Sequence, residues 1–404
     1  MAEDTVTTVG VGSIVGVGSI VGPVDVGPVA HGGHCVARLD GRVIFVRHAL
    51  PGESVRVALT DTSHDRFWRG DAVEILRAAP GRVAPRCPIA GPGRCGGCDF
   101  QHADPATQRG LKAAVLREQL AHLADLDVDV EVEPLPGGGF GWRTRMAYVA
   151  RHGRAAMRLH RSNELIDVPD GGCPLAVSTQ PDPHTLAAAL GDDDDHALRV
   201  VTAATGTTTV LVDGVVTDGP DELVERAASR DWRVDAEGFW QVHPDAADTL
   251  ASAVLEPLAA QDGERGFDLY CGVGLFAGAL SDAGVRMWGV EVDNRAIELA
   301  RSNVPAARFT AGRVDRVLRR MPRSTDLVVL DPPRTGAGKD VIDAVADRNP
   351  RAIAYVACDP AALGRDLGRL RRQGYELASL RAFDLFPNTH HVECVVICVP
   401  AIRH

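Results

Sequence analysis

The sequence lacks any run of eighteen apolar residues, the length that a membrane-spanning helix needs. Its start, MAEDTVTTVG, is acidic and lacks the basic and apolar segments of a secretory signal peptide. It also lacks a disulfide framework, because the nine cysteines are odd in number and three of them crowd into CPIAGPGRCGGC. These absences exclude membrane and disulfide-rich secreted proteins and predict a cytoplasmic protein in a reducing compartment.

Negative charge exceeds positive charge over the whole chain. The formal net charge of -11 argues against a globally basic nucleic-acid binder. Residues 141–161, GWRTRMAYVARHGRAAMRLHR, are the exception, with six arginines and no carboxylate. Two interpretations stay open: a local basic face that binds a nucleic acid through Arg143 and Arg145, or a solvated strand face whose arginines serve solubility.

The length of 404 residues, 45% of them hydrophobic, allows a sizeable core and two or three domains. Residues 1–22 are rich in Val-Gly units and are expected to form a flexible tail. Residues 23–80 alternate in short runs broken by Asp40-Gly41 and Pro51-Gly52, which predicts a small β-barrel of the OB type. The stretch AHGGHCVARLDGRVIFVRHALPGESVRV resembles the TRAM domain, a small RNA-binding barrel.

The rest of the chain predicts a multidomain α/β protein. Residues 81–235 hold the cysteine-rich loop, a helix opened by Asp104-Pro105 that runs to about Leu126, and a central α+β domain. Residues 236–404 alternate strands such as GFDLYC, DLVVLDPP and AIAYVACDP with helical stretches. This alternation is typical of a doubly wound, Rossmann-like sheet.

A nucleotide-type cofactor site is expected at FDLYCGVGLFAGAL. Gly272 and Gly274 would let a ligand approach the backbone at the start of a helix. The spacing also satisfies a dinucleotide fingerprint, but Asp268 inside the strand, Glu291 about twenty residues on and the later LDPPR favour S-adenosylmethionine. Glu291 would accept hydrogen bonds from a ribose or be a surface carboxylate, and Asp268 would contact the cofactor or cap a helix.

A thiol and two carboxylates are candidates for catalysis. Asp331 and Cys358 each end a predicted strand at the same edge of the sheet. A thiolate added to C6 of a pyrimidine would make C5 nucleophilic, and a base such as Glu393, which interrupts an apolar terminal strand, would remove the C5 proton. Cys358 as a buried spacer and Glu393 as half of a structural ion pair are the alternatives. The adjacent His390 and His391 lack a nearby third ligand, which disfavours a metal site there.

FDLYCGVGLFA, LDPPRTGA, YVACDPAALGRD and LFPNTHHVE, in this order, resemble the RNA 5-methyluridine methyltransferase family over about residues 23–404. The resemblance implies a class I methyltransferase domain with Cys358 as nucleophile, Glu393 as base and Asp331 as a pocket residue. It further implies that S-adenosylmethionine is contacted by four residues: Gln241, Tyr270, Gly272 and Glu291. Phe239 would lie near the target base.

The branch of this family with a TRAM domain and a metal cluster acts mainly on 23S rRNA, although tRNA is also possible. The resemblance implies that Cys87, Cys95, Cys98 and Cys173 ligate a [4Fe-4S] cluster, and four thiolates would equally suit zinc. The gap between Cys87 and Cys95 is longer than in the family, so the loop path differs. We expect single-stranded or looped RNA as the partner and no obligate protein partner.

Two rival functions stay open. One is a small-molecule methyltransferase of the same fold, which the barrel and the pair of Cys358 and Glu393 disfavour. The other is a non-catalytic RNA-binding module, in which the thiol would be dispensable.

Overall fold

The computed structural model describes residues 16–191 and 194–401. These residues form two compact units. The first holds the described residues up to Val115 together with Ala156–Pro169 and Pro387–His390, and the second holds the rest. No helix among the described residues is both long and apolar enough to cross a membrane.

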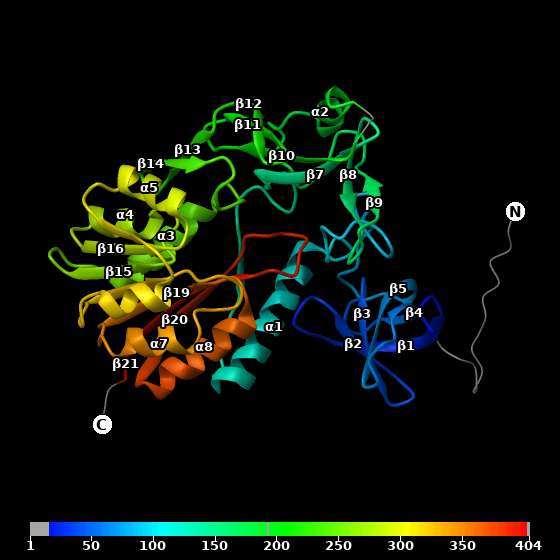
Figure 1. The fold of residues 1–404 in the computed structure, drawn as a ribbon. Helices are drawn as coiled ribbons and strands as arrows, with labels where there is room; N and C mark the ends of the chain where they lie inside the picture. The colour runs from blue at the N-terminus through cyan, green and yellow to red at the C-terminus, as the bar shows by residue number, and fades with distance from the viewer. Residues whose placement is uncertain (1–15, 192–193, 402–404) are drawn as a thin grey trace, which may run out of the picture. The chain divides into compact units, whose positions relative to one another are not determined.

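A closed five-stranded barrel lies in the first unit (blue in Figure 1). Its strands follow the order β1-β2-β3-β5-β4, with the bounds Ile20–Val29 (β1), Cys35–Leu39 (β2), Arg42–Arg47 (β3), Ser54–Asp61 (β4) and Phe67–Arg77 (β5). Asp40 and Gly41 adopt positive φ of 50° and 81° at the β2–β3 turn, as the Asp-Gly signal predicts. Ile44, Val55 and Val57 are fully buried inside, so the predicted barrel is confirmed.

The barrel starts earlier than expected. Residues 20–22 were predicted to belong to the tail, but Ile20 and Val21 pair with Ala58 and Val57 of β4. This assignment was wrong because pairing with β4 satisfies the backbone of a Val-Gly segment that has no core of its own. Residues 1–15, which hold most of the expected tail, lie outside the described residues.

Helix α1 (Pro105–Ala124) begins as predicted, since the backbone N–H of Thr107 donates to Asp104 Oδ1 over 2.7 Å. Leu111 and Val115 extend the barrel core of the first unit. In the same unit, β8 (Arg154–Arg158) and β9 (Leu165–Asp167) pair antiparallel.

The second unit contains an antiparallel sheet and a hairpin that precede the C-terminal domain. The sheet strands follow the order β12-β11-β10-β7, and the elements of this part are β7 (Arg145–Arg151), α2 (Pro183–Ala189), β10 (His196–Thr202), β11 (Thr208–Val212), β12 (Val215–Asp218), β13 (Glu222–Ala227) and β14 (Arg230–Asp235). β13 and β14 pair only with each other. The chain leaves β14 directly toward the C-terminal domain.

The C-terminal domain is an eight-stranded sheet with the order β17-β16-β15-β18-β19-β21-β20-β6. Its strands are β6 (Val132–Pro134), β15 (Arg265–Leu269), β16 (Arg286–Glu291), β17 (Arg308–Ala311), β18 (Leu327–Leu330), β19 (Ala352–Ala357), β20 (Tyr375–Asp384) and β21 (Glu393–Pro400). The five strands from β17 to β19 are parallel, whereas β21 is antiparallel to both of its neighbours. The predicted Rossmann-like sheet is confirmed.

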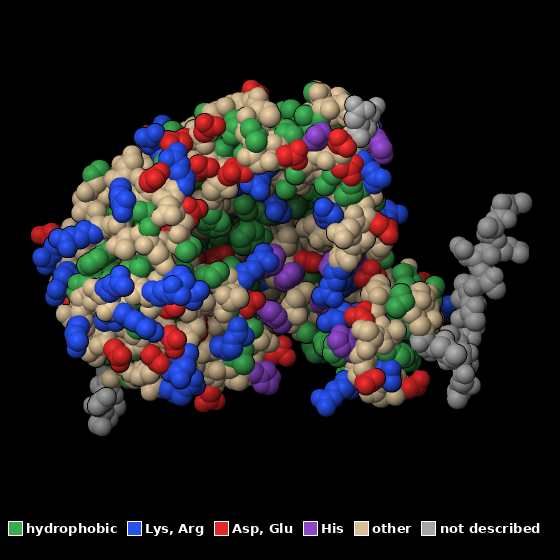
Figure 2. All heavy atoms as spheres, in the orientation of Figure 1, with side chains coloured by type: hydrophobic (Ala, Val, Ile, Leu, Met, Phe, Trp, Pro, Cys, Tyr) green, Lys and Arg blue, Asp and Glu red, His purple; other side chains and the backbone are tan. Residues whose placement is uncertain are grey.

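Helices cover both faces of this sheet, with α3, α4 and α5 on one side and α7 and α8 on the other (Figure 1). The helices are α3 (Ala246–Leu258), α4 (Leu275–Asp282), α5 (Asn294–Asn303), α6 (Val314–Val317), the 3-10 turn η1 (Leu318–Arg320), α7 (Lys339–Ala346) and α8 (Pro360–Arg372). β18 and β19 are buried along their whole length, as strands covered on both faces must be. On the face drawn in Figure 2, Lys and Arg side chains are interleaved with Asp and Glu.

Candidate active site

Four parallel strands of the second unit end at one edge of the sheet. β16 ends at Glu291, β15 is followed by Tyr270, β18 by Asp331 and β19 by Cys358. β16, β15, β18 and β19 are successive neighbours in the sheet, so their carboxyl ends lie in a row. β15 lies where the chain reverses its direction of winding, which is where doubly wound sheets bind ligands.

The turn after β15 is tied to β16. The backbone N–H groups of Tyr270 and Cys271 both donate to Val290 O, over 2.8 and 3.0 Å. Tyr270 adopts a φ of 68°, uncommon for a residue with a side chain, and Gly274 (φ 97°) caps α4. Apart from its two chain neighbours, no described residue has an atom within 4 Å of the place that a Cβ on Gly272 would occupy, so the backbone there is open to a ligand.

Two carboxylates flank this turn. Glu291 accepts hydrogen bonds from the N–H groups of Gly272 over 3.2 Å and of Val292 over 2.6 Å. Asp268 is fully buried; its Oδ2 accepts from the N–H of Ala277 in α4 over 2.8 Å, while Oδ1 has no hydrogen-bond partner among the described residues. Burial raises the pKa of Asp268 to about 7. The contact with α4 matches the helix-capping alternative, and the unpaired Oδ1 leaves an acceptor for a ligand.

Strand pairing brings Cys358 and Glu393 together. Ala357 at the end of β19 pairs with Cys394 in the antiparallel strand β21. Cys358 follows Ala357 and Glu393 precedes Cys394, so the same register continued by one residue would place Cys358 opposite Glu393, the first residue of β21. Glu393 is 4% exposed, so a carboxyl group lies buried beside a thiol at the sheet edge.

The electrostatics of this pair favour protonated groups. Burial, and then the charge of Asp331, raises the pKa of Glu393 well above its ordinary value. Burial, followed by the charges of Glu393 and Asp331, raises the pKa of the Cys358 thiol to about 12. Burial, with Glu291, raises the pKa of Asp331 to about 7. The free protein therefore holds Cys358 as a thiol at neutral pH.

Arg334 is a site residue whose role the sequence did not reveal. Its positive charge lowers the pKa of both Cys358 and Glu393 and so opposes the effect of burial. Its Nη2 also lies 3.3 Å from His391 Nε2. In the sequence, Arg334 is marked only as the last residue of LDPPR.

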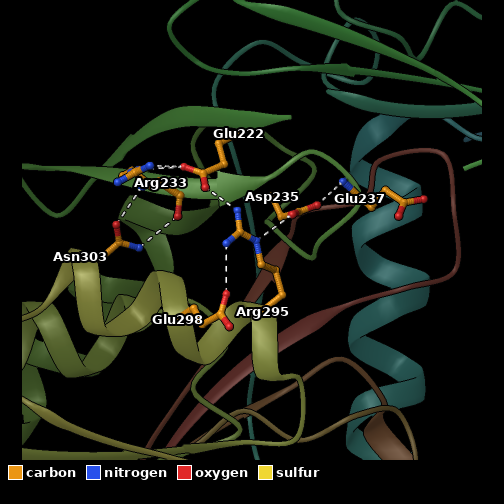
Figure 3. A network of polar contacts seen from close by, with 7 residues as sticks. All are labelled: Glu222, Arg233, Asp235, Glu237, Arg295, Glu298 and Asn303. Atoms are coloured by element: carbon orange, nitrogen blue, oxygen red, sulfur yellow. Dashed lines mark hydrogen bonds and ion pairs between the residues drawn. The ribbon is translucent and has the colours of Figure 1, made fainter. Parts of the chain in front are cut away.

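The loop after β14 carries two further predicted residues. Phe239 is 72% exposed, and Gln241 follows the buried Trp240. Figure 3 shows how β14 is fastened to α5: Arg295 donates to Asp235 Oδ2 over 3.2 Å and to Glu298 Oε2 over 3.2 Å, and it also bonds Glu222 of β13. The loop with Phe239 and Gln241 thus starts from a strand held next to the helix that follows Glu291.

The two predicted RNA-binding arginines make backbone contacts within their own unit. Arg145 Nη1 donates to Ala236 O over 3.2 Å and to Gly238 O over 2.6 Å, directly before Phe239. Arg143 Nε donates to Arg145 O over 3.2 Å. Both side chains are half-buried, and Arg145 therefore supports the Phe239 loop.

The predicted cluster cysteines are divided between the two units, with Cys87, Cys95 and Cys98 in the first and Cys173 in the second. Gln101 Nε2 donates to Cys98 Sγ over 3.1 Å, and the N–H of Gly97 donates to Cys95 Sγ over 3.4 Å. Within residues 16–191 and 194–401, no three His, Cys, Asp or Glu side chains are grouped so that they could hold a metal ion. The expected cluster is therefore not seen as a preformed ligand set.

Comparisons with known proteins agree with this arrangement. Residues 318–399 match the family model described as tRNA (Uracil-5-)-methyltransferase, residues 17–73 the TRAM domain and residues 242–355 the methyltransferase small domain. An RNA methyltransferase of Streptomyces avermitilis is 46% identical over 94% of this chain and 98% of its own. The 23S rRNA (uracil(1939)-C(5))-methyltransferase of Alkalilimnicola ehrlichii is 29% identical over 91% of this chain and 94% of its own.

Among solved structures, the fold is similar to that of Pyrococcus abyssi tRNA (uracil-54, C5)-methyltransferase in complex with S-adenosyl-L-homocysteine. The TM-score is 0.72 at 23% identity, over 93% of this chain and 99% of that one.

Proposed function

Because this chain belongs to the TRAM-containing RNA uracil-C5 methyltransferase family, we propose that it methylates C5 of a uridine in 23S rRNA through a covalent adduct of Cys358. The observation that supports the proposal is the register of β19 and β21, in which Ala357 pairs with Cys394, the neighbours of Cys358 and the buried Glu393. The relative from Alkalilimnicola ehrlichii, named for 23S rRNA, supports that substrate over tRNA.

The residues at the strand ends suit S-adenosylmethionine. Glu291 would hold the ribose, and the open backbone at Gly272 would approach the methionine part. The unpaired Oδ1 of Asp268 offers a further acceptor, and Tyr270 and Gln241 would complete the wall. When bound, this cofactor supplies an electrophilic methyl group.

The chain's own groups would then perform the steps at uracil. Cys358 loses its proton to Asp331, whose pKa of about 7 leaves a carboxylate available at neutral pH, and the sulfur bonds to C6. The electron density released at C5 takes up the methyl group. The carboxylate form of Glu393, which the positive charge of Arg334 favours, removes the C5 proton. The C6–S bond then breaks, and the departing thiolate regains its proton from Asp331. The raised pKa of Cys358 means that thiolate formation is coupled to the addition rather than preceding it.

The target base must leave its stack to reach Cys358, which costs a few kcal/mol in a duplex and less in a loop. Phe239, exposed on the loop that Arg145 supports, would stack on the extruded uracil or its neighbour.

Nucleoside mass spectrometry tests the reaction. Purified protein is incubated with labelled S-adenosylmethionine and with 23S rRNA or tRNA transcripts, using wild type, Cys358→Ala and, as a matched control, Cys398→Ala. Cys398 is also a buried cysteine of this sheet, but it pairs with Ile353, away from the edge. We expect labelled 5-methyluridine in 23S rRNA from wild type and Cys398→Ala and none from Cys358→Ala. Label found only in tRNA would mean that tRNA, and not 23S rRNA, is the substrate. Formation of 5-methyluridine by Cys358→Ala would overturn the covalent step.

We also propose, on the family resemblance, that Cys87, Cys95, Cys98 and Cys173 bind a [4Fe-4S] cluster. The amide groups of Gly97 and Gln101 that donate to two of the sulfurs support this, because such bonds stabilise thiolate ligands. Iron and acid-labile sulfide in anaerobically purified protein test it: we expect four of each per chain and their loss in Cys98→Ser. Zinc in the purified protein, with no acid-labile sulfide, would mean that the cysteines bind zinc and not an iron-sulfur cluster.

A further inference from the structure

The segment Asp331–Gly338 joins β18 to α7 without regular secondary structure, yet it carries both Asp331 and Arg334. Its far end is bound to one side chain. The N–H groups of Ala337 and Gly338 donate to Asp366 Oδ2 over 2.8 and 3.3 Å. The hydroxyl of Tyr355 donates to the same oxygen over 2.6 Å and accepts from the N–H of Ala337 over 3.2 Å.

Asp366 is not needed by its own helix. It lies inside α8, whose N-terminus is capped by Asp359, and it is 6% exposed. A carboxylate buried at mid-helix costs free energy unless it is hydrogen-bonded, and the partners of Asp366 are the loop and Tyr355. The hydroxyl of Tyr355 stays protonated, because burial raises its pKa well above the usual value.

The loop also fits closely over this carboxylate. Gly336 has a φ of 84°, and a Cβ there would lie 2.7 Å from Asp366 Oδ2. The backbone approaches the acceptor at a distance that only glycine permits.

Both anchors belong to the elements that carry the thiol. Tyr355 lies three residues before Cys358 in β19, and α8 begins two residues after it. A loop anchored on these elements keeps its place relative to Cys358. We propose that Asp366 and Tyr355 are positioning residues that hold the Asp331–Gly338 loop so that Arg334 stays close to Cys358 and Glu393. The inference rests on the proposed role of Cys358 as nucleophile.

Two variants and a matched control test the proposal. Asp366→Asn keeps the shape and one acceptor but weakens the bonds to the loop, and Tyr355→Phe removes only the hydroxyl. Asp343→Asn is the control, since Asp343 in α7 pairs with Arg369 of α8 and accepts from Gln373 over 2.8 Å, away from the loop. The first readout is the alkylation rate of the Cys358 peptide at pH 8 to 10, which needs neither RNA nor turnover. The second is kcat and KM for 5-methyluridine formation.

We expect slower alkylation of Cys358 in Asp366→Asn, by about 3-fold or more, because a displaced Arg334 stabilises the thiolate less. We expect kcat to fall by roughly 10- to 100-fold with the KM for S-adenosylmethionine within about twofold, as misplacement of a catalytic group predicts. Tyr355→Phe should show smaller changes in the same direction, and Asp343→Asn none. Arg334→Ala should slow alkylation as well, and adding Asp366→Asn to it should slow alkylation no further.

Unchanged alkylation in both Asp366→Asn and Tyr355→Phe would overturn the proposal, as would an additive effect in the double variant. The alkylation data stand even if wild type forms no 5-methyluridine, so failure of the proposed function would be seen separately. If Asp366→Asn does not fold, the alkylation rates of Tyr355→Phe, of Arg334→Ala and of the two substitutions combined provide the same test.

Discussion

At the scale of single residues, the proposed reaction gives the buried carboxyl of Glu393 a specific role. Thiol addition and methyl transfer would not use it, but the C5 proton could not leave without a base. Glu393→Gln, which keeps the shape, should therefore accumulate the covalent RNA adduct and lower product formation by about 10²-fold or more. Denaturing electrophoresis with labelled RNA measures the adduct. The double variant Cys358→Ala/Glu393→Gln should form none, and turnover of Glu393→Gln at the wild-type rate would show that another group is the base.

The titration of Asp268, a residue of the candidate cofactor site, should make the stability of the folded protein depend on pH. Its folded pKa of about 7 lies above the ordinary 3.8, so the folded protein binds the proton more tightly than the unfolded chain. Stability without cofactor should therefore fall as pH rises from about 4 to about 7. Asp268→Asn removes this loss, and we expect its Tm relative to wild type to rise by a few degrees between pH 5 and pH 8.

Scanning calorimetry at both pH values measures this difference. Asp340→Asn, at an exposed carboxylate in the first turn of α7, is the control and should shift the Tm equally at pH 5 and pH 8. A constant difference for Asp268→Asn would mean that Asp268 is ionised in the folded protein across this range. The same variant should bind S-adenosylmethionine more weakly if Oδ1 contacts it.

At the scale of elements, Arg295 of α5 fastens the β13–β14 hairpin through two carboxylates, Glu222 and Asp235, and also pairs with Glu298 in its own helix (Figure 3). Its side chain is 44% exposed, so each ion pair alone contributes little to stability. The larger effect should be on the loop that follows β14. Arg295→Ala should speed amide exchange in β13 and β14 and raise the KM for S-adenosylmethionine by about 3- to 10-fold, because Gln241 loses its fixed place. Arg226→Ala removes an exposed pair with Asp231 on the same hairpin and should change neither.

Local signals predicted most of the elements. Asp40-Gly41 gave a hairpin, Asp104 a helix cap and Gly272 to Gly274 the turn into α4, because each depends on a few neighbouring residues. The contacts that the sequence did not predict join residues that are far apart in the chain. β6 joins β20 across some 250 residues of chain, and Asp366 acts on a loop about 30 residues away. The roles of Arg334 and Arg145 were missed for the same reason: their pattern suggests charge, but only the folded chain shows what each side chain contacts.

At the scale of the whole molecule, an acidic chain is proposed to bind a polyanion. The barrel offers a surface that does not depend on net charge. On β3 and β5, Arg42 lies 4.3 Å over the ring of Trp68 and Arg69 lies 4.9 Å over that of Phe67. His64, in the loop before β5, stacks on Phe67 at 4.4 Å. Aromatic rings with flanking arginines bind single-stranded bases by stacking and the backbone by charge.

Phe67→Ala should separate these two contributions to RNA binding. Loss of one stacked base should weaken affinity by roughly 5- to 50-fold, while the slope of log Kd against log salt should stay that of wild type, because no phosphate contact is removed. Arg69→Ala should instead reduce the slope by about 0.7, the value for one contact to a single strand. Fluorescence anisotropy with a looped RNA at several salt concentrations measures both, and Val73→Ala, at an exposed apolar residue of β5, is the control. Wild-type affinity in Phe67→Ala would mean that RNA meets the enzyme elsewhere, and a reduced salt slope in that variant would mean that Phe67 holds the arginine rather than a base.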